Sequence, residues 1–180
     1  PKMFIKVFFH QIHHLIDAPL GYNTKNIVTL DNTGDSSKVE TFISKLKRQA
    51  CIENVSVSSG IPFDRGNNNT MSYRGRTISF QEFTADTSFM SIYGLKLIRD
   101  NHIDDEKGVY INKLALSEMG LNMDAKNFIC NDEPYIIRGI VNDFHLGDIT
   151  REPHPVIIHI LKRVKFSGKS RELSIQGTGD

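Results

Sequence analysis

The segment from Ile140 to Asp148, with the sequence IVNDFHLGD, combines residue types that can bind divalent metal ions. An Asp-x-His pair after an apolar strand, followed by Gly-Asp, is how the ligand set of a metal-dependent phosphoesterase begins. Such enzymes hold two metal ions and need many further ligands, but no Asn-His pair follows Asp148, and His154 lies between two prolines. The sequence therefore favours a backbone role for Asp143, His145 and Asp148 at a turn. A phosphoesterase-like hydrolase that uses these three residues is the alternative.

Three histidines near the N-terminus, His10, His13 and His14, are a second candidate metal site. His10 and His14 are one helical turn apart, as in a zinc-binding pair. The glutamate of the His-Glu-x-x-His motif is missing, so a metalloprotease base is absent here. Because these histidines share a polar face with Lys6 and Gln11, the sequence favours a solvated helix face, with adventitious metal binding as the alternative.

Other catalytic patterns are incomplete. The serine turn at 58–60 lacks the Gly-x-Ser-x-Gly elbow of serine hydrolases, and the glycines at 177–179 open no helix that could hold a phosphate. Cys51 and Cys130 form no Cys-x-x-Cys pattern, which excludes a finger-type zinc site. Since they fall in different predicted subdomains, we expect free thiols. The sequence thus predicts no catalytic, cofactor-binding or metal-ligating residue, and no enzyme.

The composition is that of a soluble globular protein. Of 180 residues, 39% are hydrophobic and 24% are charged, which suits one domain or two small subdomains with a buried core. Lysine and arginine number 22 against 21 aspartate and glutamate, so the formal charge of +1 gives no reason to expect a nucleic-acid partner. No apolar window is long enough to cross a bilayer, and no signal peptide is visible. Because the numbering begins at Pro1 rather than Met, we expect a fragment of a longer protein.

Hydrophobic periodicity predicts the elements of the N-terminal third. Apolar residues recur every three or four positions over 4–16, which predicts an amphipathic helix ended by Pro19 and Gly21. Segments 26–31 and 54–60 are predicted strands. Between them, Ser36 or Ser37 can cap a helix whose buried stripe is Val39, Phe42, Ile43 and Leu46. Such a crossover unit places the two strands parallel, with the helix covering one face.

The composition changes after residue 60, where PFDRGNNNT marks a boundary. Two short strands are predicted to turn at Arg74 and Gly75. Two short helices are each predicted between a cap and a glycine that tolerates the left-handed conformation: Asp86 or Thr87 with Gly94, and Asn112 with Gly120. The remaining predicted strands are 108–111, 135–141, 155–160 and 171–177.

Five segments, taken in order, resemble the MacB-like periplasmic core domain. They are LGYNTKNIVTL, FISKLKRQACIENVSVSSGIPF, TADTSFMSIYGLKLI, VYINKLALSEMGL and IIRGIVNDFHLGDITREPHPVII. This domain is the large first extracytoplasmic loop of FtsX/MacB-type ABC transporter permeases, and the versions in Bacteroides-like bacteria are most similar. The resemblance covers about 20–160 and, weakly, 172–177. Because GIVNDFHLGDI matches the strand-and-turn signature of the family, the resemblance implies that the likeness to phosphoesterases is coincidental.

The resemblance implies an α+β fold with two subdomains. Residues 20–61 and 156–180 would form a ferredoxin-like β-α-β porter subdomain, 62–155 an inserted mixed α+β subdomain, and 1–19 a helix that continues a removed membrane helix. The family usually adds a helix and a strand after the position of Ile175. We therefore expect a porter subdomain that is incomplete at its C-terminus, with an unpaired strand edge.

The resemblance also implies a function. The chain would be the periplasmic domain of an inner-membrane ABC transporter permease, non-catalytic and without cofactors, that transmits ATP-driven motion as a lever. Its partners would be the membrane helices of its own permease, the cytoplasmic ABC ATPase indirectly, and a second copy in a homodimer, but not nucleic acid. The predicted contact surfaces are the helix over 4–16 and the loop over 63–71. A free-standing ligand-binding module, with a pocket between the subdomains, is a further alternative.

Overall fold

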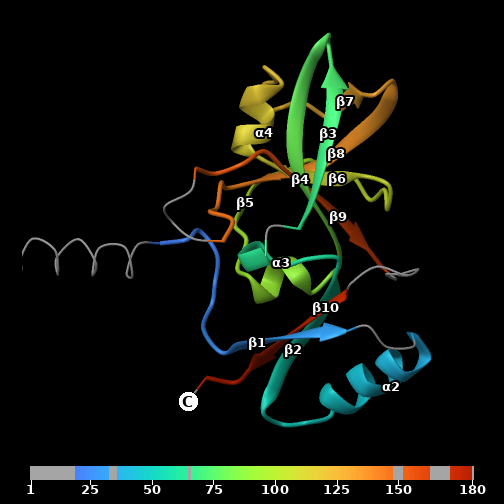
Figure 1. Ribbon diagram of the computed structural model, residues 1–180, viewed down its shortest axis with the longest axis vertical. Helices are drawn as coiled ribbons and strands as arrows, with labels where there is room; N and C mark the ends of the chain where they lie inside the picture. The colour runs from blue at the N-terminus through green and yellow to red at the C-terminus, as the bar shows by residue number, and fades with distance from the viewer. Residues whose placement is uncertain (1–18, 33–35, 65, 148–151, 163–170, 180) are drawn as a thin grey trace, which may run out of the picture.

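The computed structural model describes residues 19–32, 36–64, 66–147, 152–162 and 171–179 (Figure 1). The predicted N-terminal helix with His10, His13 and His14 lies outside these residues, and so does Asp148. Within the ranges that are described, no helix has the length and apolar character that crossing a membrane requires.

Strands dominate the described residues, with a few short helices among them. The helices are α2 (Ser36–Leu46), the 3-10 helix η1 (Pro62–Asp64), α3 (Phe89–Ile92) and α4 (Lys113–Glu118). The strands are β1 (Ile27–Asn32), β2 (Ile52–Ser58), β3 (Asn67–Tyr73), β4 (Arg76–Asp86), β5 (Leu97–Asp100), β6 (Val109–Asn112), β7 (Asn127–Cys130), β8 (Glu133–Val141), β9 (Val156–Leu161) and β10 (Arg171–Gly177). They pair in the order β1-β10-β2-β4-β9-β6-β8-β5, with β3 on β4 and β7 on β8. The mixed sheet and few helices agree with the predicted α+β class.

Strands β1, β10 and β2 form one end of the molecule together with α2 (Figure 1). Strand β10 lies between β1 and β2 and is antiparallel to both, so β1 and β2 run parallel, as predicted for the crossover unit. A small core beneath α2 consists of Val55, Leu173 and Ile175, with Ile43 and Leu46 packed against it. The prediction that Phe42 belongs to the buried stripe is wrong, because its side chain is 44% exposed.

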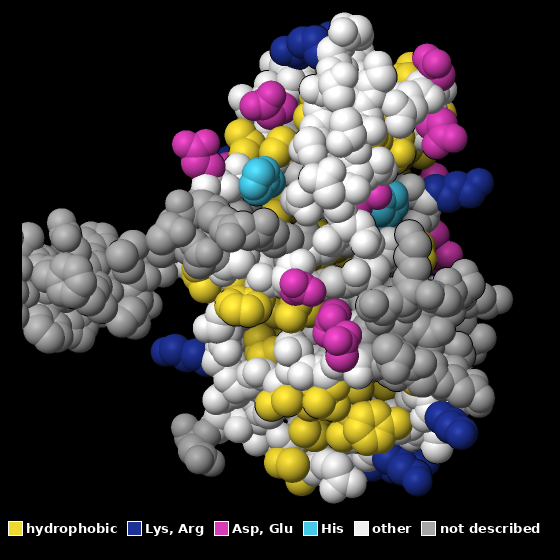
Figure 2. All heavy atoms as spheres, in the orientation of Figure 1, with side chains coloured by type: hydrophobic (Ala, Val, Ile, Leu, Met, Phe, Trp, Pro, Cys, Tyr) yellow, Lys and Arg dark blue, Asp and Glu magenta, His cyan; other side chains and the backbone are white. Residues whose placement is uncertain are grey.

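The exposure of Phe42 has a counterpart on the sheet. Val28 and Leu30 of β1 pair with Ile175 and Leu173 of β10, so they share the face of the sheet that carries the core beneath α2. Both Val28 and Leu30 are nevertheless exposed. Figure 2 shows hydrophobic side chains gathered at this end of the molecule, over the region of β1 and α2. One helix therefore leaves the β1 side of this three-stranded face uncovered.

The long strand β4 connects this end to the rest of the sheet. Near its C-terminal end, Ala85 pairs with Ser58 of β2, while its N-terminal half forms a hairpin with β3. Strand β9 runs parallel to β4 and antiparallel to β6, so it lies among the strands of the 62–155 segment. The division into subdomains at 61/62 and 155/156 remains a prediction.

Two larger cores fill this second part. One lies around β3, β4, β6, α4, β7 and β8, and the other around α3, β9 and the turn that follows β8. Phe80, Phe83, Phe89 and Phe144 are among their fully buried side chains. Each buried aromatic side chain contributes about 1.5–3 kcal/mol by removal from water, so packing of this kind gives the fold its stiffness.

The structure tests the predicted hairpin turn, helix ends, helix caps and free cysteines. The hairpin turn at Arg74 and Gly75 is confirmed, since both residues have positive φ. Gly94 and Gly120 end α3 and α4 with positive φ, as predicted. The prediction that Asp86 or Thr87 caps α3 is confirmed in part, because the N-cap residue is Ser88 but the Asp86 Oδ1 accepts from Ser88 N (3.0 Å). The residues before α2 are not described, so its predicted cap remains untested. Cys51 and Cys130 are free, as predicted.

Candidate functional site

The polar residues of IVNDFHLGD form a turn after β8 that we call the junction turn, Asn142–Gly147. Its hydrogen bonds reach four different parts of the chain. Asn142 N donates to Lys96 O (3.0 Å), the Asp143 Oδ1 accepts from Leu114 N (2.8 Å), His145 N donates to Leu20 O (2.8 Å) and Gly147 N donates to Pro62 O (3.0 Å). Phe144 and Leu146 point into the core. The turn thus joins the segment before β5, helix α4, the N-terminal segment and η1.

The N-terminal segment Leu20–Asn23, which we call the strap, lies directly on the junction turn. Gly21 has a φ of +84°, and a Cβ atom added there would lie 2.9 Å from both the Asp143 carbonyl oxygen and Phe144. Only glycine fits such a conformation at such a close approach. The ring of Tyr22 packs edge-on against Phe144, with centroids 6.3 Å apart. The strap is therefore held by backbone contact as well as by aromatic packing.

The other side of the strap is attached to Tyr93, at the end of α3. Asn23 N donates to Tyr93 O (2.8 Å), and the rings of Tyr22 and Tyr93 lie edge-on at 6.2 Å. The hydroxyl of Tyr93 is 2.7 Å from that of Ser174 on β10. Burial raises the pKa of Tyr93 to about 12, so this hydroxyl stays protonated and keeps its hydrogen bond. Tyr93 thereby connects the strap to β10.

Asn112 is the second polar centre of the site, at the end of β6 beside the end of β8. It is fully buried, and its Oδ1 accepts from both Ala115 N and Val156 N at 2.9 Å. Its Nδ2 donates to His154 O at 2.9 Å. The predicted cap of α4 is confirmed, and the same side chain also fixes the start of β9. Since Asp143 bonds Leu114 N of the same helix, both side chains serve the backbone.

The histidines and carboxylates within the described ranges do not come together as a metal site would require. In the part of the chain that the structure describes, no group of three or more His, Cys, Asp and Glu residues could hold a metal ion. His154 contributes its carbonyl to Asn112, and His159 lies 3.9 Å from Glu82 on the neighbouring strand. Asp143 and His145 lie in the junction turn, and Asp148 is not among the described residues.

A cavity of about 180 Å³ lies between β1 and the strap, lined by Tyr22, Ile27, Phe63 and Tyr93 among others. It is smaller than most small-molecule pockets, which enclose about 300–1,000 Å³.

The predicted contact loop over 63–71 is only partly a loop. Phe63 is 69% exposed, whereas residues 67–71 belong to β3, and Met71 is buried. Residues 67–71 therefore form a strand rather than the predicted loop, and the contact surface over 63–71 stays a prediction.

The chain is similar to known proteins in its structure rather than in its sequence. No family model matches the sequence. No curated protein matches it either. Among solved structures, the periplasmic region of MacB from Actinobacillus actinomycetemcomitans is similar at a TM-score of 0.59 and 13% identity, over 92% of this chain and 80% of that one. The chain has the MacB-like periplasmic fold. This confirms the resemblance drawn from the five sequence segments, while the subdomain details stay a prediction.

Two further structures share this fold. The extracellular domain of the noncanonic ABC-type transporter YknZ from Gram-positive bacteria has a TM-score of 0.55 and 13% identity, over 78% of this chain and 73% of that one. A domain of a proposed permease protein from Porphyromonas gingivalis has a TM-score of 0.56 and 12% identity, over 85% and 75%. At such identities the likeness establishes the fold, and the narrower similarity to Bacteroides-like versions stays a prediction.

Sequence reasoning predicted a turn after β8 but missed the segments to which it is bonded. The strap residues Gly21 and Tyr22, and the role of Tyr93, were not predicted. The available signal was Gly21, because a glycine beside an aromatic residue can mark a close approach of two chain segments. Nothing in the sequence indicated which segment would approach it.

Proposed function

We propose that this chain is the extracytoplasmic domain of an ABC transporter permease and that it transmits motion from the membrane helices without catalysing a reaction. The observation that carries this proposal is the attachment of the strap to the junction turn and to Tyr93. The MacB-like fold supports the same context, since the similar solved structures are periplasmic or extracellular domains of transporters.

The contacts define a route for force. Residues 1–19, which are expected to continue a membrane helix, lead directly into the strap. A displacement of the strap acts on the junction turn through Leu20 and Gly21, and on α3 through Asn23. From there Asp143 leads to α4, and Tyr93 leads to β10. Because the contacts along this route are hydrogen-bonded or tightly packed, the domain would move with the strap as one body.

The partners follow from this proposal. The domain would lie on the periplasmic side of the inner membrane, joined to the membrane helices of its own permease, and would respond indirectly to the cytoplasmic ABC ATPase. A second copy in a homodimer is part of the proposal, and nucleic acid is not. The exposed apolar side chains of Val28, Leu30 and Phe42 support the expectation that the porter subdomain is incomplete, since the family usually adds a helix and a strand after the position of Ile175.

Spin-label distances in the full permease, assembled with its ATPase, test the lever. In a background with Cys51→Ser and Cys130→Ala, one label is placed at Thr24 beside the strap and one at Lys113 on α4, both exposed positions. Pulsed electron paramagnetic resonance measures their separation with and without ATP. We expect a constant distance within the domain and a nucleotide-dependent distance between the labels of two copies. A nucleotide-dependent change within one domain, or no change at all, would contradict the lever.

A further inference from the structure

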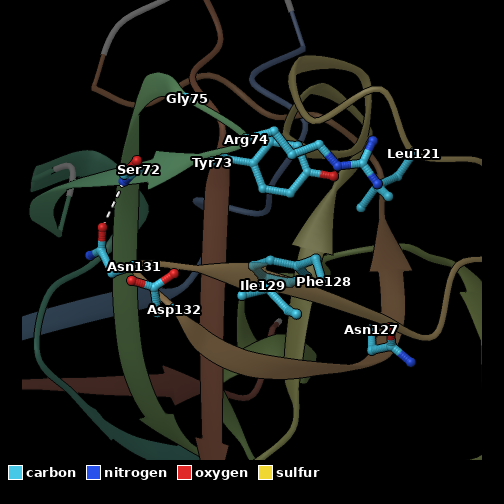
Figure 3. A pocket seen from close by; sticks show the side chains of 10 residues that line it. All are labelled: Ser72, Tyr73, Arg74, Gly75, Leu121, Asn127, Phe128, Ile129, Asn131 and Asp132. Carbon is cyan, nitrogen blue, oxygen red and sulfur yellow. Dashed lines mark hydrogen bonds between the residues drawn. The ribbon is translucent and has the colours of Figure 1, made fainter.

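A cavity of about 430 Å³ is lined by residues of the β3–β4 and β7–β8 hairpins (Figure 3). The tips of these hairpins lie at the end of the molecule far from α2 (Figure 1). Its volume falls within the usual range of small-molecule pockets, about 300–1,000 Å³. It is separate from the junction turn and plays no part in the proposed transmission of motion. Its wall residues include Tyr73, Arg74, Leu121, Phe128, Ile129 and Asp132.

The walls of this cavity are held in place by their own hydrogen bonds. Each hairpin ends in a two-residue turn with both residues at positive φ: Arg74 (47°) with Gly75 (75°), and Asn131 (49°) with Asp132 (60°). Two bonds lock the tips to each other, because Ser72 N donates to the Asn131 Oδ1 (2.7 Å) and Asn131 N donates to Ser72 O (2.9 Å). A ligand would therefore meet a preformed site and spend little free energy on ordering it.

Arg74 is an unusual residue for its position. Asn, Asp and Gly dominate such turns because other side chains are strained at positive φ. The Arg74 guanidinium lies 5.2 Å from the centre of the Tyr73 ring, and among the described residues no carboxylate forms an ion pair with it. Arg74 is exposed at the edge of the cavity, so its guanidinium is available to a ligand without breaking an ion pair of the described residues.

The two hairpin tips carry opposite charges on either side of an apolar surface. Figure 3 shows Arg74 and Leu121 along one side of the cavity and Asn131 with Asp132 along the other. Phe128 and Ile129 lie between them; Phe128 is buried in the core, so the exposed apolar surface is that of Ile129. A ligand that satisfied this lining would carry an anionic group, a cationic group and an apolar body between them.

We propose that this cavity binds a small zwitterionic compound with an apolar body, of which a short hydrophobic peptide with free ends is the simplest example. Its carboxylate would accept hydrogen bonds from the Arg74 guanidinium, whose planar fork suits a carboxylate. Its ammonium group would pair with the carboxylate of Asp132. Its side chains would cover the exposed side chain of Ile129.

Nuclear magnetic resonance titration of the 180-residue chain tests this proposal. The probe is the dipeptide Leu-Phe, compared with its N-acetylated and C-amidated forms, and the amide signals of Ser72 and Asn131 report on the cavity. We expect a saturable shift with a dissociation constant of about 1 mM or tighter for the free dipeptide. Blocking either end should weaken binding at least about threefold, because each block removes one charged contact.

Two variants assign the contacts. Arg74→Asn and Asp132→Asn remove one charge each and introduce a residue that tolerates positive φ, so both hairpins keep their turns. Arg74→Asn should bind the free and the amidated dipeptide equally, and Asp132→Asn should bind the free and the acetylated dipeptide equally. Lys107→Asn, at an exposed residue outside the cavity lining, should retain both preferences.

Three results would overturn the proposal. The first is the absence of a saturable shift at millimolar dipeptide. The second is equal binding of the free dipeptide and a form blocked at both ends, which would indicate a purely apolar surface. The third is an Arg74→Asn variant that still prefers the free carboxylate. Unchanged spectra away from the hairpins establish that each variant is folded, so that a loss of binding can be interpreted.

Discussion

Asp31 and Glu172 lie directly opposite each other in the antiparallel pair of β1 and β10. The pKa of Glu172 is raised to about 7 by burial first, then by the charge and hydrogen bond of Asp31 and by the charge of Asp64. Tyr93, which also feels the charge of Glu172, lies close by on α3. An acidic pair of this kind makes the central strand of the porter end sensitive to protons.

The pH dependence of stability follows from this pair. The ordinary pKa of 4.5 applies to Glu172 in the unfolded chain, so the folded state holds a proton that the unfolded state has already lost. The stabilisation by this proton is fully present below pH 4.5, the pKa in the unfolded chain, and is lost as the pH rises through about 7, the pKa in the folded chain. We expect urea unfolding to show Glu172→Gln more stable than the natural chain above this window, by about 1 kcal/mol once screening by water is included.

Glu53→Gln is the matched control for this prediction, because Glu53 is an exposed glutamate on the neighbouring strand β2. It should leave the pH profile unchanged. The prediction would be contradicted if the free energies of unfolding of Glu172→Gln and of the natural chain fell equally between mild acid and neutral pH. Protonation of Glu172 would then make no contribution to stability.

Gly21→Ala should lower the free energy of unfolding by more than the cost of a positive φ at alanine. Gly21 and Gly120 both have positive φ, but a Cβ atom at Gly21 would meet Asp143 and Phe144 at 2.9 Å, while the space around Gly120 is open. Positive φ costs a non-glycine residue about 1–2 kcal/mol. We expect Gly120→Ala to lose about that much, and Gly21→Ala about 1–3 kcal/mol more through overpacking, measured by chemical unfolding. Equal losses would mean that the strap can move away from the turn without cost.

Asn112→Ala should be among the most destabilising polar substitutions in the chain. It would leave the amides of Ala115 and Val156 and the carbonyl of His154 without their partner inside the protein. Buried groups left unsatisfied cost about 1–3 kcal/mol each where water cannot reach them. We expect a loss of about 2–4 kcal/mol in the free energy of unfolding, against less than about 0.5 kcal/mol for Asn122→Ala at an exposed position. A small loss at Asn112 would show that water replaces its side chain.

Local features of the fold could be predicted where one residue decides them. The turn at Arg74 and Gly75 follows from a glycine between two alternating segments, and the ends of α4 follow from Asn112 and Gly120. These signals act over a few residues and need no knowledge of the rest of the chain. The predicted crossover of β1 and β2 held for the same reason, because a short connection permits few arrangements.

Predictions failed where distant segments decide the outcome. Phe42 fits the helical period of α2, but whether it is buried depends on how much of the sheet the helix covers. Asp86 accepts from Ser88 N before α3, but its carboxylate also accepts bonds from Ser56 and Val57 on β2, which the sequence did not indicate. The partner of the junction turn was missed likewise, because Leu20 and His145 are far apart in the sequence. Periodicity and capping rules contain no information on such pairings.

Asp143 distinguishes the structural interpretation of IVNDFHLGD from the hydrolase alternative. Its Oδ1 accepts a bond from Leu114 N in the first turn of α4. Asp143→Asn keeps an acceptor oxygen and should retain nearly full stability, whereas Asp143→Ala should lose about 1 kcal/mol, as helix caps do. A chelator should not change the unfolding midpoint of either variant or of the natural chain. In a metal-dependent hydrolase, Asn and Ala would both abolish turnover, and chelation would lower the stability of the natural chain alone, because the amide is a poor replacement for a ligating carboxylate.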